Sequence, residues 1–291
     1  MTPKDNKSTR TVLATLVLLA AVLGGLWLFG RDHGGQTAYR QAVHTAQLVQ
    51  QMDDALNAAA QAEKQAVMAE TDEDSRRFAG NARSATNTVG ALLAELKQLP
   101  QQSPQQTELL SRFEAAFAEY LKADQDVLGL AVQNTNIKAL ALSFGKAALV
   151  LGELEQALRP LQNGASDSQA RQALRVLSEA LRIQALHAPH IMEKTDQRMD
   201  ALEQRMAASD KAAREALAAL GKQQAGVKAL AIYEQYWAFT GEIVGLSRQN
   251  TNVRSLALSL ERKTKVLESC AQTLRDLEKN AREDMASKAT R

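Results

Sequence analysis

Two histidines separated by two residues have the clearest capacity for chemistry in this chain. They lie in the segment His187-Ala-Pro-His190. Residues three apart share a helix face, so both imidazoles could bind one metal ion, although Pro189 disturbs that turn. A protein metal site needs further ligands, and the aligned positions of an internal repeat hold Glu63 and Ala66. We therefore predict no metal and no cofactor, with His187 and His190 as the metal candidates to be checked.

Aromatic side chains and a pair of arginines are the candidates for binding an organic ligand. Tyr236 and Trp237 belong to the densest aromatic group, and Tyr120 matches Tyr236 in the repeat. They could line a pocket between helices, but packing in an alanine-rich core is the favoured interpretation. Arg76 and Arg77 lie near the start of a predicted helix, where they could hold a carboxylate or lie solvated at the surface.

The sequence shows no catalytic motif. It contains no phosphate-binding glycine loop, no Ser-His-Asp arrangement at a telling spacing and no CxxC pair. Its single cysteine, Cys270, cannot form an intrachain disulfide. The repeat partner of Cys270 is Leu154, which favours a small buried apolar side chain, with a disulfide across a dimer as the alternative. We predict that the protein is not an enzyme.

The composition is typical of a helical protein. Hydrophobic residues make up 45% of the chain but aromatic residues only 4%, and the 5 prolines leave long stretches in which a helix can propagate. Residues 1–30 hold Lys4, Lys7 and Arg10 against Asp5, so the remaining charges balance at 32 basic and 32 acidic residues (35 less three, 33 less one). Without a basic stripe, nucleic-acid binding loses its electrostatic driving force, and we exclude it.

Residues 11–30 contain no charged side chain and, as a helix of about 30 Å, would match the thickness of a bilayer core. Arg10 and Arg31 flank this segment, and Trp27 lies where an interfacial aromatic residue belongs. We expect a transmembrane helix with a cytoplasmic N-terminus, residues 1–10, and the rest of the chain outside the cytoplasm. The alternative is a cleaved signal peptide, although the apolar run is long for one and no A-x-A-like site follows it.

An internal duplication organises the rest of the chain. The segment DVLGLAVQNTNIKALALS, residues 126–143, recurs as EIVGLSRQNTNVRSLALS, residues 242–259, with 10 of 18 positions identical at an offset of 116. Upstream the offset is 124, and it pairs residues 68–72 with residues 192–196. The change of offset falls in a predicted loop, where length differences are tolerated.

Start and stop signals divide each copy into four helices. In the first copy we expect helices over residues 36–70, 72–99, 107–133 and 137–160, with Thr71 capping the second and residues 134–136 forming the last turn. The fourth helix of each copy carries an apolar stripe in steps of three and four, which predicts a bundle seam. The stripe consists of Ile137, Leu140, Phe144, Ala147, Leu151, Leu154 and Leu158, aligned with Val253, Leu256, Leu260, Lys263, Leu267, Cys270 and Leu274.

The predicted fold is therefore all-α, with an N-terminal transmembrane helix at residues 11–30 followed by two tandem antiparallel four-helix bundles. We place the first bundle at residues 36–160 and the second at residues 165–284, and residues 285–291 form a tail. Both bundles should have the same internal plan because they descend from one duplicated segment.

The chain resembles the extracytoplasmic four-helix-bundle sensor domain of methyl-accepting chemotaxis proteins and related bacterial sensor kinases. The resemblance rests on the apolar N-terminal helix, the Met68-Ala-Glu-Thr-Asp72 junction and the passage Gly129-Leu-Ala-Val-Gln-Asn-Thr-Asn-Ile-Lys-Ala-Leu140, and it covers most of residues 11–284, once per copy. It implies a homodimer that senses small molecules, such as organic acids or amino acids, or that contacts a periplasmic protein.

This sequence departs from the family in showing neither a second membrane helix nor a cytoplasmic signalling region. We therefore expect a sensor or signalling accessory module in the bacterial inner membrane, with residues 31–291 periplasmic, that acts through a membrane signalling partner. The alternative is a structural tether or scaffold of the cell envelope without a ligand. A buried charged residue facing a bundle axis would favour the sensor, because burying a charge is costly unless a partner compensates it.

Overall fold

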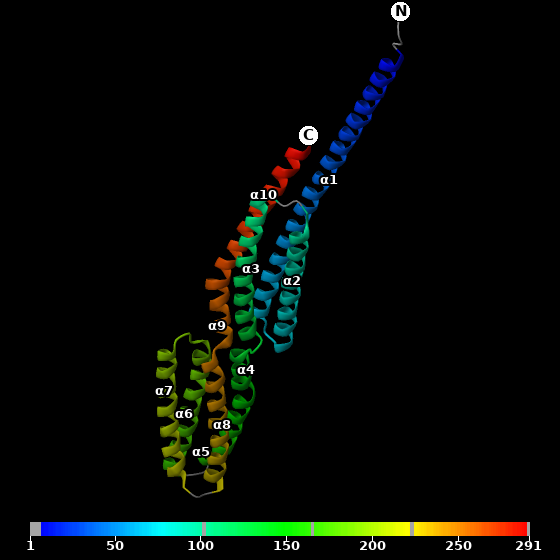
Figure 1. Cartoon of the computed structure of the whole chain (residues 1–291). Coiled ribbons are helices and arrows are strands. Elements are labelled where there is room, and N and C mark those ends of the chain that lie inside the picture. Colours follow the sequence, from blue (N-terminus) through cyan, green and yellow to red (C-terminus); the bar gives the residue numbers. More distant parts are fainter. Residues whose placement is uncertain (1–6, 101–102, 164–165, 222–223, 290–291) are drawn as a thin grey trace, which may run out of the picture. The chain divides into compact units, whose positions relative to one another are not determined.

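The structure is a computed structural model that describes residues 7–100, 103–163, 166–221 and 224–289, with side chains at 36–100, 103–162, 166–221 and 224–287. Every element in these ranges is a helix, which confirms the all-α prediction (Figure 1). The elements are α1 (Lys7–Met68), α2 (Asp72–Gln98), α3 (Pro104–Ala131), α4 (Thr135–Leu142), η1 (Ser143–Ala147), α5 (Ala148–Asn163), α6 (Asp167–Met192), α7 (Asp196–Leu220), α8 (Gln224–Gln249), α9 (Thr251–Leu258), η2 (Ser259–Lys263) and α10 (Thr264–Ala289).

The predicted membrane span, residues 11–30, falls in the first part of α1, where side chains lie outside the described part of the chain. Within the described part, none of the helices combines the length and the apolar character that a bilayer crossing requires. Most of residues 1–10 also lie outside the described part.

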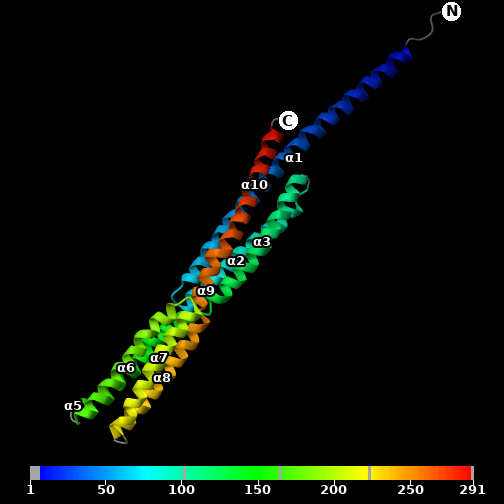
Figure 2. The same ribbon diagram turned by 90° about the vertical axis from the view of Figure 1, so that its left-hand side faces the viewer.

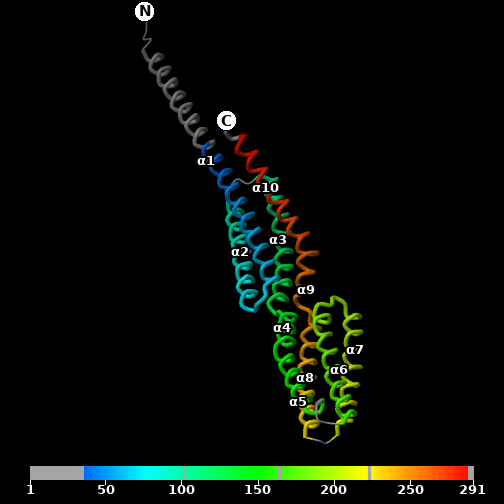
Figure 3. Tube along the Cα trace, turned by 180° about the vertical axis from the view of Figure 1, so that it is seen from behind, coloured from blue at the N-terminus to red at the C-terminus, as the bar shows by residue number. Residues whose placement is uncertain are grey.

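Two compact units make up the chain, and α1, α2, α3 and α10 each contribute residues to both. Unit 1 consists of Met1–Ala58, Ser84–Glu119 and Val266–Arg291, and unit 2 consists of Ala59–Arg83 and Tyr120–Lys265. In unit 1 the segments of α1, α2, α3 and α10 run side by side (Figures 2 and 3). In unit 2 each of α5, α6, α7 and α8 packs against at least one of the others, and α6 and α8 each contact all three.

These units differ from the predicted ranges 36–160 and 165–284. The helix formed by α4, η1 and α5 was expected in the first bundle, but it packs against α6 and α8 of the second copy. Residues 266–284, expected in the second bundle, belong to unit 1 with helices of the first copy. The two copies have therefore exchanged their fourth helices.

The exchange follows from the connection before each fourth helix. A single residue, Asn250, separates α8 from α9, and its left-handed backbone (φ 52°) resembles that of Asn134 before α4 (φ 51°). In the first copy three residues separate α3 from α4, but the backbone N–H groups of Val132 and Gln133 still donate to Leu128 and Leu130, so only Asn134 leaves the helical path. One such residue bends a chain, whereas a reversal between antiparallel helices needs a loop of about 2–5 residues. Within unit 2, the start of each fourth helix, α4 or α9, therefore continues from the end of the third helix instead of folding back along it (Figure 1).

The two connections bind each other reciprocally inside unit 2. The backbone N–H of Thr135 donates to Thr251 Oγ1 and that of Thr251 donates to Thr135 Oγ1, both at 3.2 Å. The backbone N–H groups of Asn136 and Asn252 donate to each other's Oδ1 at 3.2 Å. The repeated Asn-Thr-Asn segment thus satisfies the buried polar groups of both crossings, in addition to forming the predicted turns.

Two π-helical segments, η1 and η2, occupy equivalent positions in the two copies. A π turn contains one extra residue, which shifts the helix face by about 100°. The predicted stripe holds from Ala147 and Lys263 onward, where Leu154 and Cys270 are buried, but it is wrong within the π-helical segments. Phe144 is 67% exposed and Leu260 is 62% exposed, and the preceding serines, Ser143 and Ser259, are buried in their place.

This shift predicts that Phe144 contributes little to stability. Replacing Phe144 with Ser should change the free energy of unfolding in urea by less than about 0.5 kcal/mol, because the ring already lies in solvent. The same result is expected for Leu260→Ser. A loss of about 3 kcal/mol or more, as for a truncated buried phenylalanine, would contradict the exposed register of Phe144.

Candidate functional site

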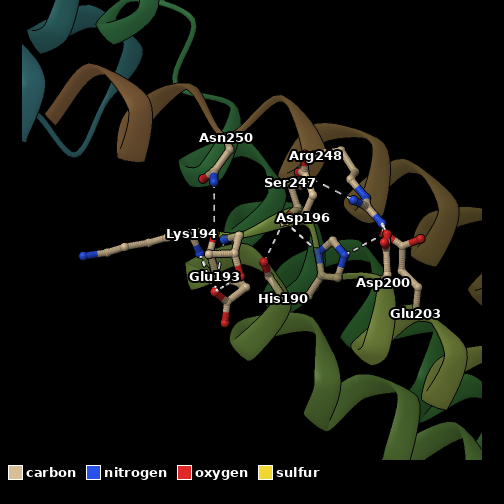
Figure 4. Close-up of polar contacts among 10 residues, drawn as sticks. His190, Glu193, Lys194, Asp196, Asp200, Glu203, Ser247, Arg248 and Asn250 are labelled. Carbon is tan, nitrogen blue, oxygen red and sulfur yellow. Dashed lines mark hydrogen bonds and ion pairs between the residues drawn. The ribbon is translucent and has the colours of Figure 1, made fainter. Parts of the chain in front are cut away.

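A buried histidine near the end of α6 forms the centre of a polar network in unit 2 (Figure 4). His190 Nε2 lies 2.8 Å from Glu203 Oε1 on α7, and His190 Nδ1 lies 2.8 Å from Ser247 Oγ on α8. Because a carboxylate only accepts, Nε2 carries a proton that it donates to Glu203. Ser247 Oγ also lies 3.0 Å from the backbone oxygen of His190, to which it donates. Three helices thus meet at one side chain.

Arg248 extends the network towards solvent. Its Nε donates to Glu203 Oε1 at 2.6 Å, and its other nitrogens pair with Asp200 and, at 3.7 Å, with Asp196. Burial raises the pKa of Glu203, but the hydrogen bonds from Arg248 and His190 outweigh it and hold that pKa below its usual value. The pKa of Arg248 is raised by its hydrogen bonds to Glu203 and Asp200. Glu203 is therefore a carboxylate and Arg248 a cation at neutral pH.

A pocket of about 270 Å³ opens beside this network, between α7 and α8. Its apolar wall includes Met206, Trp237 and Val244, and its polar groups come from Glu203 and Thr240. A largely apolar pocket with a few polar groups is the usual form of a small-molecule site, although this one lies just below the usual size range. The pocket is completed by Ala207 and Gly241.

The second histidine, His187, lies behind the pocket and binds Thr240. Its Nε2 is 3.2 Å from Thr240 Oγ1, and its Nδ1 is 3.1 Å from Ser143 Oγ. Thr240 gives its own proton to the backbone oxygen of Tyr236, so it accepts from His187. Burial, followed by the charge on His190, lowers the pKa of His187 to about 4. His187 is therefore neutral at physiological pH.

The first copy lacks the His190 network at the equivalent positions. The partners of His190, Glu203, Ser247 and Arg248 are Ala66, Ala79, Ala131 and Val132. In the structure Ala66 and Ala79 belong to one small apolar cluster, packed by Val132, and Ala131 to another. The helices of the first copy therefore fold and pack without polar side chains at these four positions. Since polar groups are costly to bury, their presence in one copy points to a role other than stability.

A different charged cluster is buried in unit 2, where residues from α1, α3 and η2 meet. Lys263 pairs with Glu63 Oε2 at 3.2 Å and with Asp124, and its Nζ lies 4.7 Å from the centroid of the Tyr120 ring. Lys263, Glu63 and Asp124 are each less than 5% exposed in total. Glu63 Oε1 is buried with no hydrogen-bond partner among the described residues. The buried charge expected of a sensor is thus present, but it has an internal partner.

None of the predicted ligand residues is among those that line the pocket. Arg76 pairs with Asp72 at 3.8 Å and Arg77 pairs with Asp74 at 2.7 Å, and both arginines are solvated. Tyr120 and Tyr236 are fully buried, as packing predicts. The Tyr236 hydroxyl donates to the backbone oxygen of Ala180 at 3.1 Å.

The two histidines lie together, but each ring has both nitrogens in hydrogen bonds to other side chains. Among the described residues no cluster of three or more His, Cys, Asp or Glu side chains could hold a metal ion. Sequence reasoning missed Glu203, Ser247 and Arg248. One signal could have found them, namely the positions where one copy is apolar and the other polar.

Comparison with known proteins gives a family and a fold. A family described as the four-helix-bundle sensory module for signal transduction matches residues 8–173. Among solved structures, the sensor domain of the V. parahaemolyticus histidine kinase sensor TorS aligns with a TM-score of 0.63 over 82% of this chain and 99% of that chain. The two sequences are 12% identical, so the likeness shows the fold alone. No curated protein matches this chain.

Proposed function

The chain belongs to the family of four-helix-bundle sensory modules for signal transduction, and we propose that it senses a small molecule in the pocket between α7 and α8. The role is binding and not catalysis. The observation that carries the proposal is the contrast between the copies, because the pocket adjoins polar side chains that the first copy replaces with alanine and valine.

The same network suggests how a bound molecule could alter the helices. Glu203 lines the pocket and also binds His190 on α6 and Arg248 on α8. A ligand that draws the Glu203 carboxylate towards itself would weaken both hydrogen bonds. Since the two partners lie on different helices, the relative positions of α6, α7 and α8 would respond to binding.

The cellular setting is part of the proposal. We place the protein in the bacterial inner membrane as a homodimer, anchored by residues 11–30 with residues 31–291 in the periplasm, where it passes its state to a membrane signalling partner. The uncharged, apolar character of residues 11–30 supports the anchor, and the sensory family supports the signalling role.

A pocket-filling variant tests the proposal. A Cβ built at Gly241 meets no atom within 4 Å, so Gly241→Leu should fill the pocket without straining the helix. Thermal unfolding of the full chain should be measured against a panel of amines, amino acids, organic acids and neutral compounds. A sensed compound at 100 times its Kd should stabilise the wild type by about 2.7 kcal/mol and leave Gly241→Leu unchanged.

Gly245 provides the matched control. It lies one turn further along α8, outside the pocket, and a Cβ there also meets no atom within 4 Å. Gly245→Leu should therefore respond to the compound as the wild type does. If every compound gave the same result for all three proteins, the pocket would have no ligand role, and the structural tether of the envelope would be favoured.

A further inference from the structure

We infer that the molecule held in the α7–α8 pocket is a small organic ammonium ion with an apolar body. The inference rests on the proposed function, since it assigns a chemical class to the ligand of that same pocket. Three features of the described residues support it: an acceptor oxygen, a local excess of negative charge, and an uncovered aromatic ring.

The acceptor oxygen belongs to Glu203. Both hydrogen bonds to this side chain, from His190 Nε2 and from Arg248 Nε, go to Oε1. Within the described residues, Oε2 has no donor, and the side chain is 33% exposed at the pocket. A carboxylate oxygen without a donor, in a pocket whose wall is mainly apolar, favours a ligand that carries a positive N–H or N-methyl group.

The charge around Glu203 is negative overall. Arg248 faces the three carboxylates of Asp196, Asp200 and Glu203. His190 adds a second positive group when it is protonated, so at most two cations face three negative groups. None of the residues that line the pocket is a lysine or an arginine. An organic anion would be repelled at this site, whereas a cation would reduce the excess charge.

The aromatic ring belongs to Trp237, which forms part of the pocket wall and is half-buried. Two other rings in unit 2 are already paired with cations of the chain: Arg214 lies 5.6 Å from the centroid of Tyr233, and Lys263 Nζ lies 4.7 Å from that of Tyr120. No cation of the described residues covers Trp237 in this way. Tryptophan is the ring that attracts cations most strongly, so a tryptophan in the pocket wall that pairs with no cation of the described residues suits an ammonium group.

The Lys263 cluster shows that this fold can hold an ammonium by the same means. The Lys263 ammonium lies against Asp124 and Glu63 and over the ring of Tyr120. Asp124 is the repeat partner of Thr240, a residue of the pocket. In the Lys263 cluster, carboxylates and an aromatic ring therefore already surround an ammonium group, which is supplied by the chain itself.

Titration calorimetry on the full chain tests the class of ligand. The probes are choline and n-butylammonium, each paired with an uncharged molecule of similar shape, 3,3-dimethylbutan-1-ol and 1-butanol. We expect at least one ammonium probe to bind at least tenfold more tightly than its uncharged pair. Trp237→Leu and Glu203→Gln should each weaken that binding about tenfold, Gly241→Leu should abolish it, and Gly245→Leu should leave it unchanged.

The outcomes separate this inference from the proposed function. Equal affinity for charged and uncharged probes would overturn the ammonium assignment. The ammonium assignment would also be overturned if both ammonium probes failed to bind while a neutral or anionic compound stabilised the wild type but not Gly241→Leu. In that case the pocket would still be sensory, but its ligand would not be an ammonium ion. A panel in which no compound distinguishes the wild type from Gly241→Leu would remove both.

Discussion

Replacing Lys263 with Met should destabilise the protein by about 3–5 kcal/mol, because it leaves two buried carboxylates without their cation. Glu63 and Asp124 both pair with Lys263 and are nearly inaccessible to solvent. Methionine is one atom shorter than lysine but keeps its unbranched apolar stem, so the loss reports mainly the charge and only to a small extent a cavity. Urea unfolding at neutral pH, followed by circular dichroism, measures the effect.

Two further variants make this result specific. Lys265→Met removes a charge from an exposed residue two positions further along the chain and should change stability by less than about 0.5 kcal/mol. A triple variant, Glu63→His, Asp124→Thr and Lys263→Ala, introduces the residues of the aligned positions 187, 240 and 147, with Ser259 already in place as the partner of Ser143. It should recover most of the stability lost by Lys263→Met. A cost below about 1 kcal/mol for Lys263→Met would contradict the buried ion pair.

The second large effect concerns pH and His187. Its pKa in the folded protein is about 4, lowered by burial and by His190, against about 6.5 when unfolded. Between these values the unfolded chain binds more protons than the folded one, so stability falls as the pH falls. The contribution of His187 is fully present above about pH 6.5, and about 3 kcal/mol of it is lost by pH 4.

Comparison with a His187→Gln variant isolates this contribution. Glutamine can still hydrogen-bond to Ser143 and Thr240 but does not titrate. The difference in unfolding free energy between wild type and variant should shrink steadily from pH 7 to pH 4. If that difference were independent of pH, His187 would titrate alike in the folded and unfolded states, and its imidazole would not be buried in the neutral form.

The helices and their duplication were predictable from local patterns. Thr71 illustrates this, since its Oγ1 accepts from the backbone N–H of Asp74 at 3.1 Å, as its predicted capping role requires. Such contacts involve residues close in sequence. The exchange of the fourth helices was not predictable in this way, because both arrangements bury the same apolar stripes. A backbone angle at Asn134 and Asn250, which no residue pattern reports, separates the two arrangements.

The π turns limited the prediction of the core in the same way. Ala139 and Ser255 are buried where Leu140 and Leu256 were expected, since one inserted residue moves the seam onto smaller side chains. Hydrophobicity alone favours the leucines. The side chains that fill the core before the turn are therefore smaller than the sequence pattern suggests.

The candidate site required distances that the sequence does not contain. His190 and Arg248 are far apart in the sequence, and both reach the same oxygen of Glu203. Their aligned residues in the first copy are apolar, and that contrast was visible in the sequence. It became meaningful only when the side chains were seen to meet beside a pocket.

Hydrogen–deuterium exchange of the full chain, with and without a stabilising compound from the panel, tests the sensory pocket most directly. We expect slower amide exchange in the parts of α7 and α8 that line the pocket, around Glu203 and Thr240, in the wild type and in Gly245→Leu but not in Gly241→Leu. Protection that appeared instead in unit 1, or that persisted in Gly241→Leu, would show that the molecule binds elsewhere and would contradict a sensory role for the α7–α8 pocket.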